Sequence, residues 1–232
     1  MTQNKEQRRR QVHGRIKGPK LSPRKQRLCD KVLPKLRITP PEEQNSLTPL
    51  ELFSPDKKQV WLEIGFGGGE HLAWQAAQNP DIGFIGCEPF INGVAKLLVE
   101  IDEQQLNNVM IRDDDAVDVL EALAPASIDR LFILHPDPWP KKRHHKRRFI
   151  NQHNLDLLAK VLKPGAELRF ASDIPHYVAW TLKHMTRRTD FIWTAQSAND
   201  WRTRPNDWPA TRYGQKALRE GRPPAHLRFI RV

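Results

Sequence analysis

Carboxylates stand where the apolar segments of this chain end, and they are the side chains whose types and spacing could do chemistry. Glu63, Glu88, Asp115 and Asp137 each close one of the first four predicted strands, and Asp173 follows the fifth. The carboxyl ends of parallel strands meet at one edge of a sheet, so we expect these side chains to surround one site. Carboxylates attract cations and accept hydrogen bonds. The site therefore suits a positively charged ligand with hydroxyl or amino groups.

A glycine-rich turn adjoins the first of these carboxylates, in the segment Glu63-Ile-Gly65-Phe-Gly67-Gly-Gly-Glu70. Glycine has no Cβ, so a ligand can approach the backbone, and the start of the following helix offers unpaired N–H groups. The dinucleotide motif G-x-G-x-x-G would need glycine where Glu70 stands, and Glu63 is a poor neighbour for a pyrophosphate. The turn therefore favours S-adenosylmethionine, which carries a sulfonium and an ammonium group and no phosphate, over NAD or ATP. The alternative is a tight turn that binds nothing.

Two carboxylates suit particular parts of an adenosine-containing ligand. Glu88 follows the second predicted strand and could accept hydrogen bonds from two ribose hydroxyls, as acidic residues do there in doubly wound folds. Asp115 follows the third strand and could accept from an adenine amino group. Asp115 and Asp173 could instead cap helices.

The segment from His135 to Arg148 places a carboxylate and an aromatic ring beside a basic run. Asp137 lies between two prolines and two residues before Trp139. The basic side chains that follow are Lys141, Lys142, Arg143, Lys146, Arg147 and Arg148. A rigid carboxylate next to phosphate-binding side chains indicates chemistry on a nucleobase, with the basic run holding the nucleic-acid backbone. The nearby histidines lack a metal-ligand spacing, so we expect no metal.

Positive charge is concentrated near the N-terminus. The net charge is +11, and residues 1–37 hold thirteen Lys and Arg against Glu6 and Asp30, so the rest of the chain is neutral as a whole. Such a basic arm is commonly a nucleic-acid contact and can order on binding, whereas the alternative is a solvated leader. We expect an arm at 1–37, a linker at 38–58 and one domain at 59–232.

The composition argues against membrane and secreted classes. There is no run of about 18 apolar residues, and the charged N-terminus has no apolar stretch behind it, so we expect neither a transmembrane helix nor a signal peptide. Cys29 and Cys87 are far apart and outside any CxxC spacing, which favours a reducing cytoplasm and argues against structural disulfides or zinc.

Strands and helices are predicted to alternate along the domain. We predict strands at 60–64, 82–87, 109–111, 128–135, 166–171, 191–195 and 227–232, and helices at 70–78, 90–106, 116–123, 149–162 and 175–188. Such alternation predicts a mostly parallel sheet covered on both faces, with ligands outside the carboxyl ends of the strands.

Several motifs, in this order, resemble the bacterial tRNA (guanine-N7)-methyltransferase family over nearly the whole chain. They are Gly14-Arg-Ile-Lys-Gly18, Glu63-Ile-Gly-Phe-Gly-Gly-Gly69, Pro136-Asp-Pro-Trp139 with Lys141, His144-His-Lys-Arg-Arg148, Ala171-Ser-Asp173 and Thr211-Arg-Tyr213. The resemblance implies a Rossmann-like class I fold with an antiparallel C-terminal strand. It also implies methylation of the variable-loop guanosine, position 46 of tRNA, by S-adenosylmethionine, in a cytoplasmic monomer or homodimer.

The resemblance also implies roles for individual residues. Glu63, Gly65, Gly67, Glu88, Asp115 and Asp137 would contact the methyl donor, with Asp137 also the catalytic residue. Lys141, Asp173 and the segment Thr211-Arg212-Tyr213-Gly214 would contact the guanosine, and Arg143, Lys146, Arg147 and Arg148 the RNA. Gly214 departs from the family, which usually has glutamate there.

Two other functions fit parts of the sequence. Enzymes of the same fold that methylate exocyclic amines of nucleic acids carry a motif like Asp137-Pro-Trp139 but with a second proline, which is absent here. A non-catalytic RNA-binding protein would use the basic arm and leave the strand-end carboxylates without a purpose.

Overall fold

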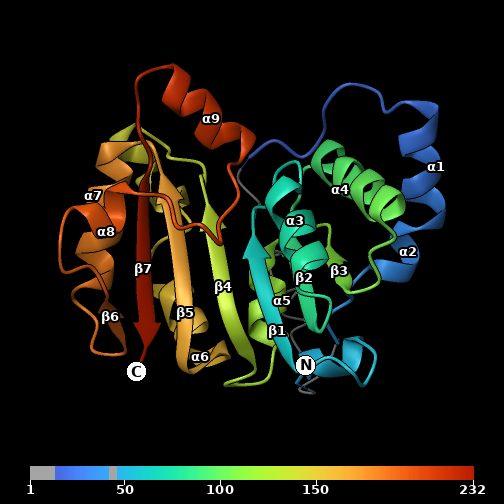
Figure 1. The fold of residues 1–232 in the computed structure, drawn as a ribbon, viewed down its shortest axis with the longest axis horizontal. Helices are drawn as coiled ribbons and strands as arrows, with labels where there is room; N and C mark the ends of the chain where they lie inside the picture. The colour runs from blue at the N-terminus through green and yellow to red at the C-terminus, as the bar shows by residue number, and fades with distance from the viewer. Residues whose placement is uncertain (1–13, 42–45) are drawn as a thin grey trace, which may run out of the picture.

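A seven-stranded sheet organises residues 14–41 and 46–232, the part of the chain that this computed structural model describes (Figure 1). The strands are β1 (Gln59–Ile64), β2 (Ile82–Cys87), β3 (Val109–Arg112), β4 (Ile128–Leu134), β5 (Leu162–Ser172), β6 (Phe191–Trp193) and β7 (Ala225–Arg231). Their order is β3-β2-β1-β4-β5-β7-β6, parallel from β3 to β5, with β7 antiparallel to both neighbours. This topology confirms the predicted α/β class and the antiparallel C-terminal strand.

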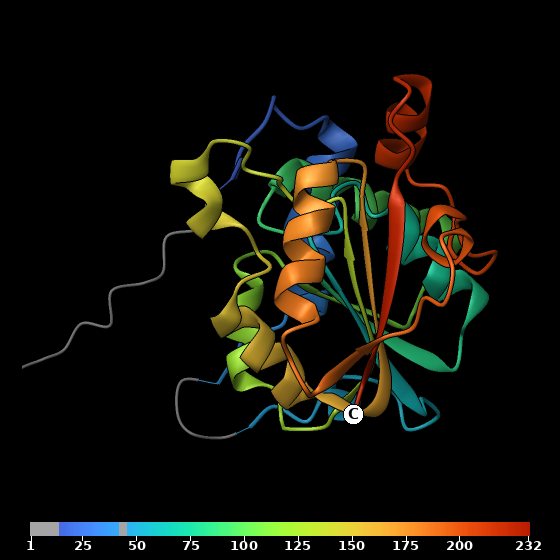
Figure 2. The ribbon, with the colours of Figure 1, turned by 90° about the vertical axis from the view of Figure 1, so that its left-hand side faces the viewer.

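Helices cover both faces of the sheet, which Figure 2 shows nearly edge-on. The helices are α1 (Pro23–Lys31), α2 (Leu33–Leu36), α3 (Glu70–Gln78), α4 (Ile91–Gln104), α5 (Ala116–Ala122), α6 (Gln152–Val161), α7 (Pro175–Met185), α8 (Asn199–Arg202) and α9 (Arg212–Arg219), with 3-10 turns η1 (Pro49–Leu52) and η2 (Lys142–Arg147). The strands are therefore buried on both sides, as their apolar sequences predict.

The two faces have separate cores. On one face Leu120 of α5, Leu158 of α6 and Tyr177 of α7 pack against the sheet. On the other face Leu72 of α3 and Leu97 of α4 belong to a core that also contains Trp61, Phe132 and Trp208. Trp208 is only 2% exposed, so the segment between β6 and α9 closes this second core.

Most predicted elements occur within a few residues of their predicted bounds, and the main differences lie near β5. The predicted turn Lys163-Pro-Gly165 lies inside β5, where the pairing with β4 shifts register between Ile128 and Arg130. Gly165 has a φ of +82°, so the segment bulges rather than ending the strand. The helix predicted from 149 begins at Gln152, because Asn151 caps it by accepting from the Asn154 amide. α9 was not predicted.

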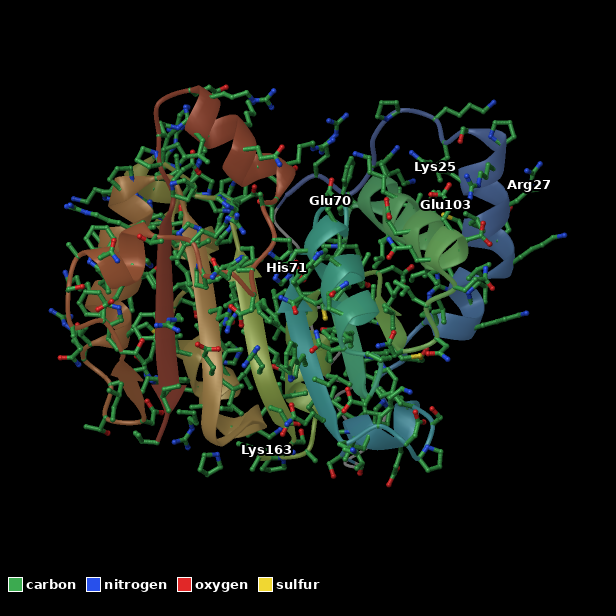
Figure 3. The ribbon with its side chains drawn as sticks, in the orientation of Figure 1. Lys25, Arg27, Glu70, His71, Glu103 and Lys163 are labelled. Carbon is green, nitrogen blue, oxygen red and sulfur yellow. The ribbon has the colours of Figure 1, made fainter. Side chains whose placement is uncertain are left out.

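Part of the predicted basic arm is folded onto the domain. Arg24 of α1 pairs with Asp102 at 3.0 Å and Glu103 at 2.6 Å, both on α4, and Figure 3 shows Glu103 facing this helix. Leu33 of α2 is buried in the core. Residues 1–13 of the arm and 42–45 of the linker lie outside the described residues, and the division at 37 and 58 stays a prediction.

Candidate active site

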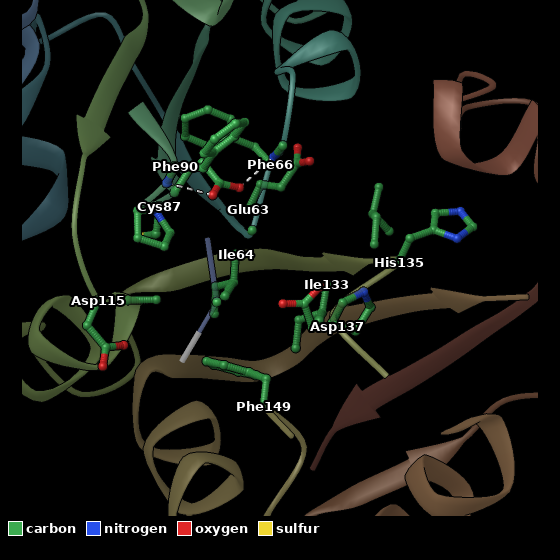
Figure 4. A pocket seen from close by; sticks show the side chains of 18 of the residues that line it. Glu63, Ile64, Phe66, Cys87, Phe90, Asp115, Ile133, His135, Asp137 and Phe149 are labelled. Carbon is green, nitrogen blue, oxygen red and sulfur yellow. Dashed lines mark hydrogen bonds between the residues drawn. The ribbon is translucent and has the colours of Figure 1, made fainter. Parts of the chain in front are cut away.

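A cavity of about 530 Å³ lies at the carboxyl ends of β1 to β4 (Figure 4). The predicted site residues that line it are Glu63, Gly65, Gly67, Glu88, Asp115, Asp137, Lys146, Arg147, Arg148, Thr211 and Tyr213. The predicted site residues outside its lining are Lys141, Arg143, Asp173, Arg212 and Gly214. Figure 4 shows Asp115 and Asp137 on opposite sides of the cavity, with Phe90 and Phe149 as further walls.

The backbone of the glycine turn after β1 lies directly against the backbone of α4. Gly67 adopts a left-handed φ of +57°, which glycine tolerates best. A Cβ placed on Gly93 of α4 would lie 2.1 Å from the Gly67 carbonyl oxygen, so only glycine fits there. This close approach fixes the turn as one wall of the cavity.

Glu88 joins the glycine turn to the start of α4. Its two carboxylate oxygens accept from the Gly67 amide at 2.8 Å and from the Phe90 amide at 3.0 Å. Burial is the main cause that raises the pKa of Glu88, the two amides oppose it, and the nearby Asp137 and Glu63 raise the pKa further. Each carboxylate oxygen has two lone pairs, so Glu88 can accept further hydrogen bonds from a ligand.

His71 on α3 holds the carboxylate of Glu63 in place. Its Oε2 lies 2.7 Å from His71 Nδ1 on α3, and each side chain is 2% exposed. The Gln75 side-chain nitrogen lies 3.3 Å from the other ring nitrogen of His71 and donates to the Asp207 carbonyl at 2.8 Å. This chain of contacts fixes the carboxylate of Glu63 and ties it to the segment that contains Trp208.

Asp115 caps a helix and also lines the cavity. Its Oδ1 accepts from the Val117 amide at 3.0 Å at the start of α5. The capping role that the sequence left open is therefore present. The side chain still lies at the cavity wall, so capping does not remove it from a ligand site.

Asp137 sits on the proline-rich loop that follows β4. The residue is exposed as a whole, its side chain lines the cavity, and partial desolvation raises the pKa of its carboxyl group. Gly14 of the arm lies so close that a Cβ on it would be 3.4 Å from Asp137 Oδ2. The arm and the loop therefore meet at this carboxylate.

The basic run divides into exposed and engaged side chains. Lys141, Arg143 and Lys146 are exposed. The Arg147 guanidinium lies 5.0 Å from the centre of the Trp139 ring. Arg148 is 1% exposed, and its Nε donates to the Pro138 carbonyl at 2.8 Å. The structure therefore sets Arg148 apart from the other side chains of the run.

A second group of predicted residues gathers around α9, next to the cavity. Thr211 Oγ1 caps this helix by accepting from the Gly214 amide at 3.0 Å. The Tyr213 ring lies against the glycine turn, since a Cβ on Gly67 would be 3.3 Å from it. Asp173 accepts from Arg222 Nε at 2.9 Å and lies 3.6 Å from His135 Nδ1. These contacts hold the start of α9 beside the cavity.

His71, Phe90, Phe149 and Trp208 were not identified from the sequence as site or support residues. His71 and Gln75 had a detectable signal, because they form a polar pair at helical spacing on the buried face of α3. The two phenylalanines offered none, since a single aromatic residue after a strand is common. The long-range packing that buries Trp208 has no local signal either.

Two absences hold for residues 14–41 and 46–232. No group of three or more His, Cys, Asp or Glu side chains is arranged to hold a metal ion. No helix within these ranges has the length and apolar character needed to cross a membrane.

The chain resembles several known proteins. A family model described as "Putative methyltransferase" matches residues 57–227. The tRNA (guanine-N(7)-)-methyltransferase of Agrobacterium fabrum is 50% identical over 94% of this chain and 94% of its own. That of Roseobacter denitrificans is 50% identical over 96% of each. Among solved structures, the 16S rRNA methyltransferase KamB superposes with a TM-score of 0.52 at 16% identity, over 82% of this chain and 96% of its own, which is a likeness of fold.

Proposed function

This chain belongs to the tRNA (guanine-N7-)-methyltransferase family, and we propose that it transfers the methyl group of S-adenosylmethionine to N7 of a guanosine in tRNA. The variable-loop guanosine at position 46 is the proposed target. The carboxylate-lined cavity at the strand ends is the observation that carries this proposal, because carboxylates attract a cationic methyl donor and accept hydrogen bonds from the N–H groups of guanine.

The cavity fits S-adenosylmethionine in size and chemistry. Its volume of about 530 Å³ falls in the range of roughly 300–1,000 Å³ that small-molecule sites occupy. Glu63 would face the positively charged end of the donor, and Glu88 would accept from the ribose hydroxyls. Asp115 would accept from the adenine amino group through the oxygen that does not cap α5. Gly65 and Gly67 would let the donor lie against the backbone.

Bound S-adenosylmethionine would supply an electrophilic methyl group. Guanine N7 already carries a free lone pair, so the protein needs no base to deprotonate the nucleophile. Its main task is to hold N7 in line with the methyl carbon, and such positioning can contribute roughly 7–11 kcal/mol.

Asp137 has the proposed catalytic role. Methylation at N7 makes the guanine cationic, and a carboxylate beside the ring stabilises charge that develops in the transition state. The same carboxylate can accept from the N–H groups of the base. The raised pKa of Asp137 reflects partial desolvation, and a partly desolvated carboxylate interacts more strongly with a developing cation than a fully solvated one.

The basic run and α9 would bind the tRNA. Lys141, Arg143 and Lys146 are exposed and would contact phosphates, with Arg147 beside them at the cavity wall. Tyr213, half-exposed next to the glycine turn, would pack on the guanosine. Asp173, Thr211, Arg212 and Gly214 would hold or contact the base from the side of α9.

The test is to incubate the protein with methyl-labelled S-adenosylmethionine and unmodified bulk tRNA and to identify the labelled nucleoside after digestion. We expect 7-methylguanosine. Label in a nucleoside methylated on an exocyclic amine would keep the methyl donor but refute the proposed chemistry. Binding of tRNA without binding of S-adenosylmethionine would instead leave a non-catalytic RNA-binding protein.

A further inference from the structure

Arg148 ends the basic run but does not reach solvent as the exposed side chains do. It is 1% exposed, whereas Lys141, Arg143 and Lys146 are exposed. A guanidinium that contacts RNA phosphates must be accessible to them. The burial of Arg148 therefore points to a function inside the protein.

The guanidinium of Arg148 binds the loop that carries Asp137. Its Nε donates to the Pro138 carbonyl at 2.8 Å, and an Nη lies 3.5 Å from the Trp139 carbonyl oxygen. The same Nη lies 2.9 Å from His176 Nδ1 on α7. A guanidinium can only donate, so His176 Nδ1 is the acceptor in this contact.

Two aromatic side chains of α7 hold this guanidinium in a fixed position. The guanidinium carbon of Arg148 lies 4.9 Å from the ring centres of both Tyr177 and Trp180. Trp180 donates from its indole nitrogen to the Ile150 carbonyl at 2.7 Å, and Tyr177 is fully buried. Aromatic faces stabilise a desolvated cation, and a rigid seat leaves the guanidinium little freedom to move.

The carbonyl groups of the proline-rich loop after β4 need hydrogen-bond donors from outside the loop. Pro136, Pro138 and Pro140 have no amide hydrogen. Trp139 has a φ of +41°, a conformation that is strained for a non-glycine residue and persists when its surroundings enforce it. Arg148 meets two successive carbonyls in this stretch, directly after Asp137.

We propose that Arg148 is a positioning residue, which fixes the carboxylate of Asp137 in the cavity by tying the Pro138 and Trp139 carbonyls to α7. This rests on the proposed function, because it takes Asp137 as the residue beside the reacting base. It also separates two adjacent arginines: Arg147 faces the substrate, and Arg148 holds the loop.

The variant Arg148→Lys tests this role while keeping the charge. A lysine ammonium cannot span two carbonyls and His176 from the same seat. We expect kcat to fall by about 10- to 100-fold, since a misplacement of about 1 Å at a reacting centre can cost roughly 100-fold. The KM for tRNA and its salt dependence should stay within about twofold.

A phosphate contact would behave differently: Arg148→Lys would retain kcat, because lysine also binds phosphate as a point charge. Unchanged kcat in Arg148→Lys, with a flatter salt dependence in Arg148→Ala, would overturn the proposal.

The matched control is Arg188→Lys, after the C-terminal end of α7. Arg188 also binds two partners, Asp190 and Asp156, each at 2.6 Å, but lies outside the site. Melting temperatures of both variants show the general cost of the substitution. Loss of kcat in the control as well would overturn a specific role for Arg148.

Hydrogen exchange of the peptide covering 135–143 gives a readout that needs no tRNA. The contacts by which Arg148 holds the Pro138 and Trp139 carbonyls, here called the clamp, predict faster exchange in this peptide in Arg148→Lys and unchanged exchange in Arg188→Lys. Equal exchange rates in both variants would overturn the proposal. If Arg148→Lys does not fold, His176→Leu removes one partner at an exposed position and should speed exchange in the same peptide; no change would overturn the clamp. A wild-type protein that makes no 7-methylguanosine would refute the proposed function, and the exchange comparison would still decide the clamp.

Discussion

The two sides of the cavity are built by different means. On the side of β1 and β2, main-chain amides hold the carboxylate of Glu88, and its partners Gly67 and Phe90 are fixed by the turn and by α4. On the side of the loop after β4, the contacts at the Pro138 and Trp139 carbonyls come from the side chain of Arg148. The first side depends on the sheet and its local turns, whereas the second depends on packing between distant elements.

This difference separates the expected effects of substitution. The side chains near the glycine turn should control affinity for the methyl donor, because they surround a site that exists before tRNA binds. The loop should control the rate of transfer, because in the proposed function it presents Asp137 to the base. The exposed basic side chains should control affinity for tRNA. The predictions that follow run from the largest expected effect to the smallest.

The substitution Asp137→Ala should reduce kcat by about 100- to 1,000-fold, the size of effect seen when one group that stabilises transition-state charge is removed. Affinity for tRNA should change little, because the basic run is intact. Single-turnover rates and tRNA binding measured on the same preparation check this. Unchanged turnover would rule out Asp137 as the residue beside the reacting base.

The substitution Glu88→Gln should weaken binding of S-adenosylmethionine by roughly 10- to 100-fold, since a hydrogen bond to a charged group is worth about 1.5–3 kcal/mol. It should leave tRNA affinity unchanged, in contrast to changes in the basic run. Calorimetric titration with S-adenosylmethionine measures the donor affinity, and Glu100→Gln on α4 is the matched control. Equal donor affinity in both variants would contradict the assignment of Glu88.

Replacing Arg143 and Lys146 together by alanine should flatten the salt dependence of tRNA binding. The loss of two phosphate contacts lowers the slope of log K against log salt by about 1.4–1.8. The control replaces Lys58 and Lys163, which lie at the opposite end of the sheet (Figure 3 labels Lys163). A slope equal to that of the wild type would show that Arg143 and Lys146 make no phosphate contacts.

Acidification should weaken donor binding before it weakens the fold. Burial raises the pKa of Glu88 and of Asp137, so both lose their charge at a higher pH than ordinary carboxylates. Above the unfolded pKa the folded protein holds more protons at these groups than the unfolded chain, so their contribution to the free energy of unfolding increases as the pH falls. Donor affinity should therefore begin to fall at a pH above the ordinary carboxyl range of about 4, while the melting temperature of the ligand-free protein shows no matching loss from these two groups. Donor affinity that stays constant down to that range would contradict the prediction.

The part of the site that follows from the sheet could be predicted from the sequence. Carboxylates after apolar runs necessarily meet at one edge of a parallel sheet, so Glu63, Glu88, Asp115 and Asp137 were found without knowledge of side-chain packing. The positions of the strands along the chain were also predictable, since hydrophobic periodicity encodes them. The register shift in β5 was not, because it depends on the pairing with β4.

The support of the site could not be predicted in the same way. Arg148 stands in a basic run, and the sequence offered no reason to separate it from Arg147. Its burial arises from α7, which comes about 30 residues later. His71 likewise acquires its meaning only when α3 packs under β1. Side chains that hold other side chains depend on tertiary contacts, whereas side chains at strand ends depend on local sequence.

One measurement tests the central claim most directly. A single transcribed tRNA is incubated with the protein and S-adenosylmethionine, reduced with borohydride and treated with aniline, which cleaves the chain at 7-methylguanosine. We expect one cut at the variable-loop guanosine with the wild type and almost none with Asp137→Ala. Cleavage at another guanosine would contradict the proposed target. Methyl incorporation without any cleavage would contradict transfer to N7.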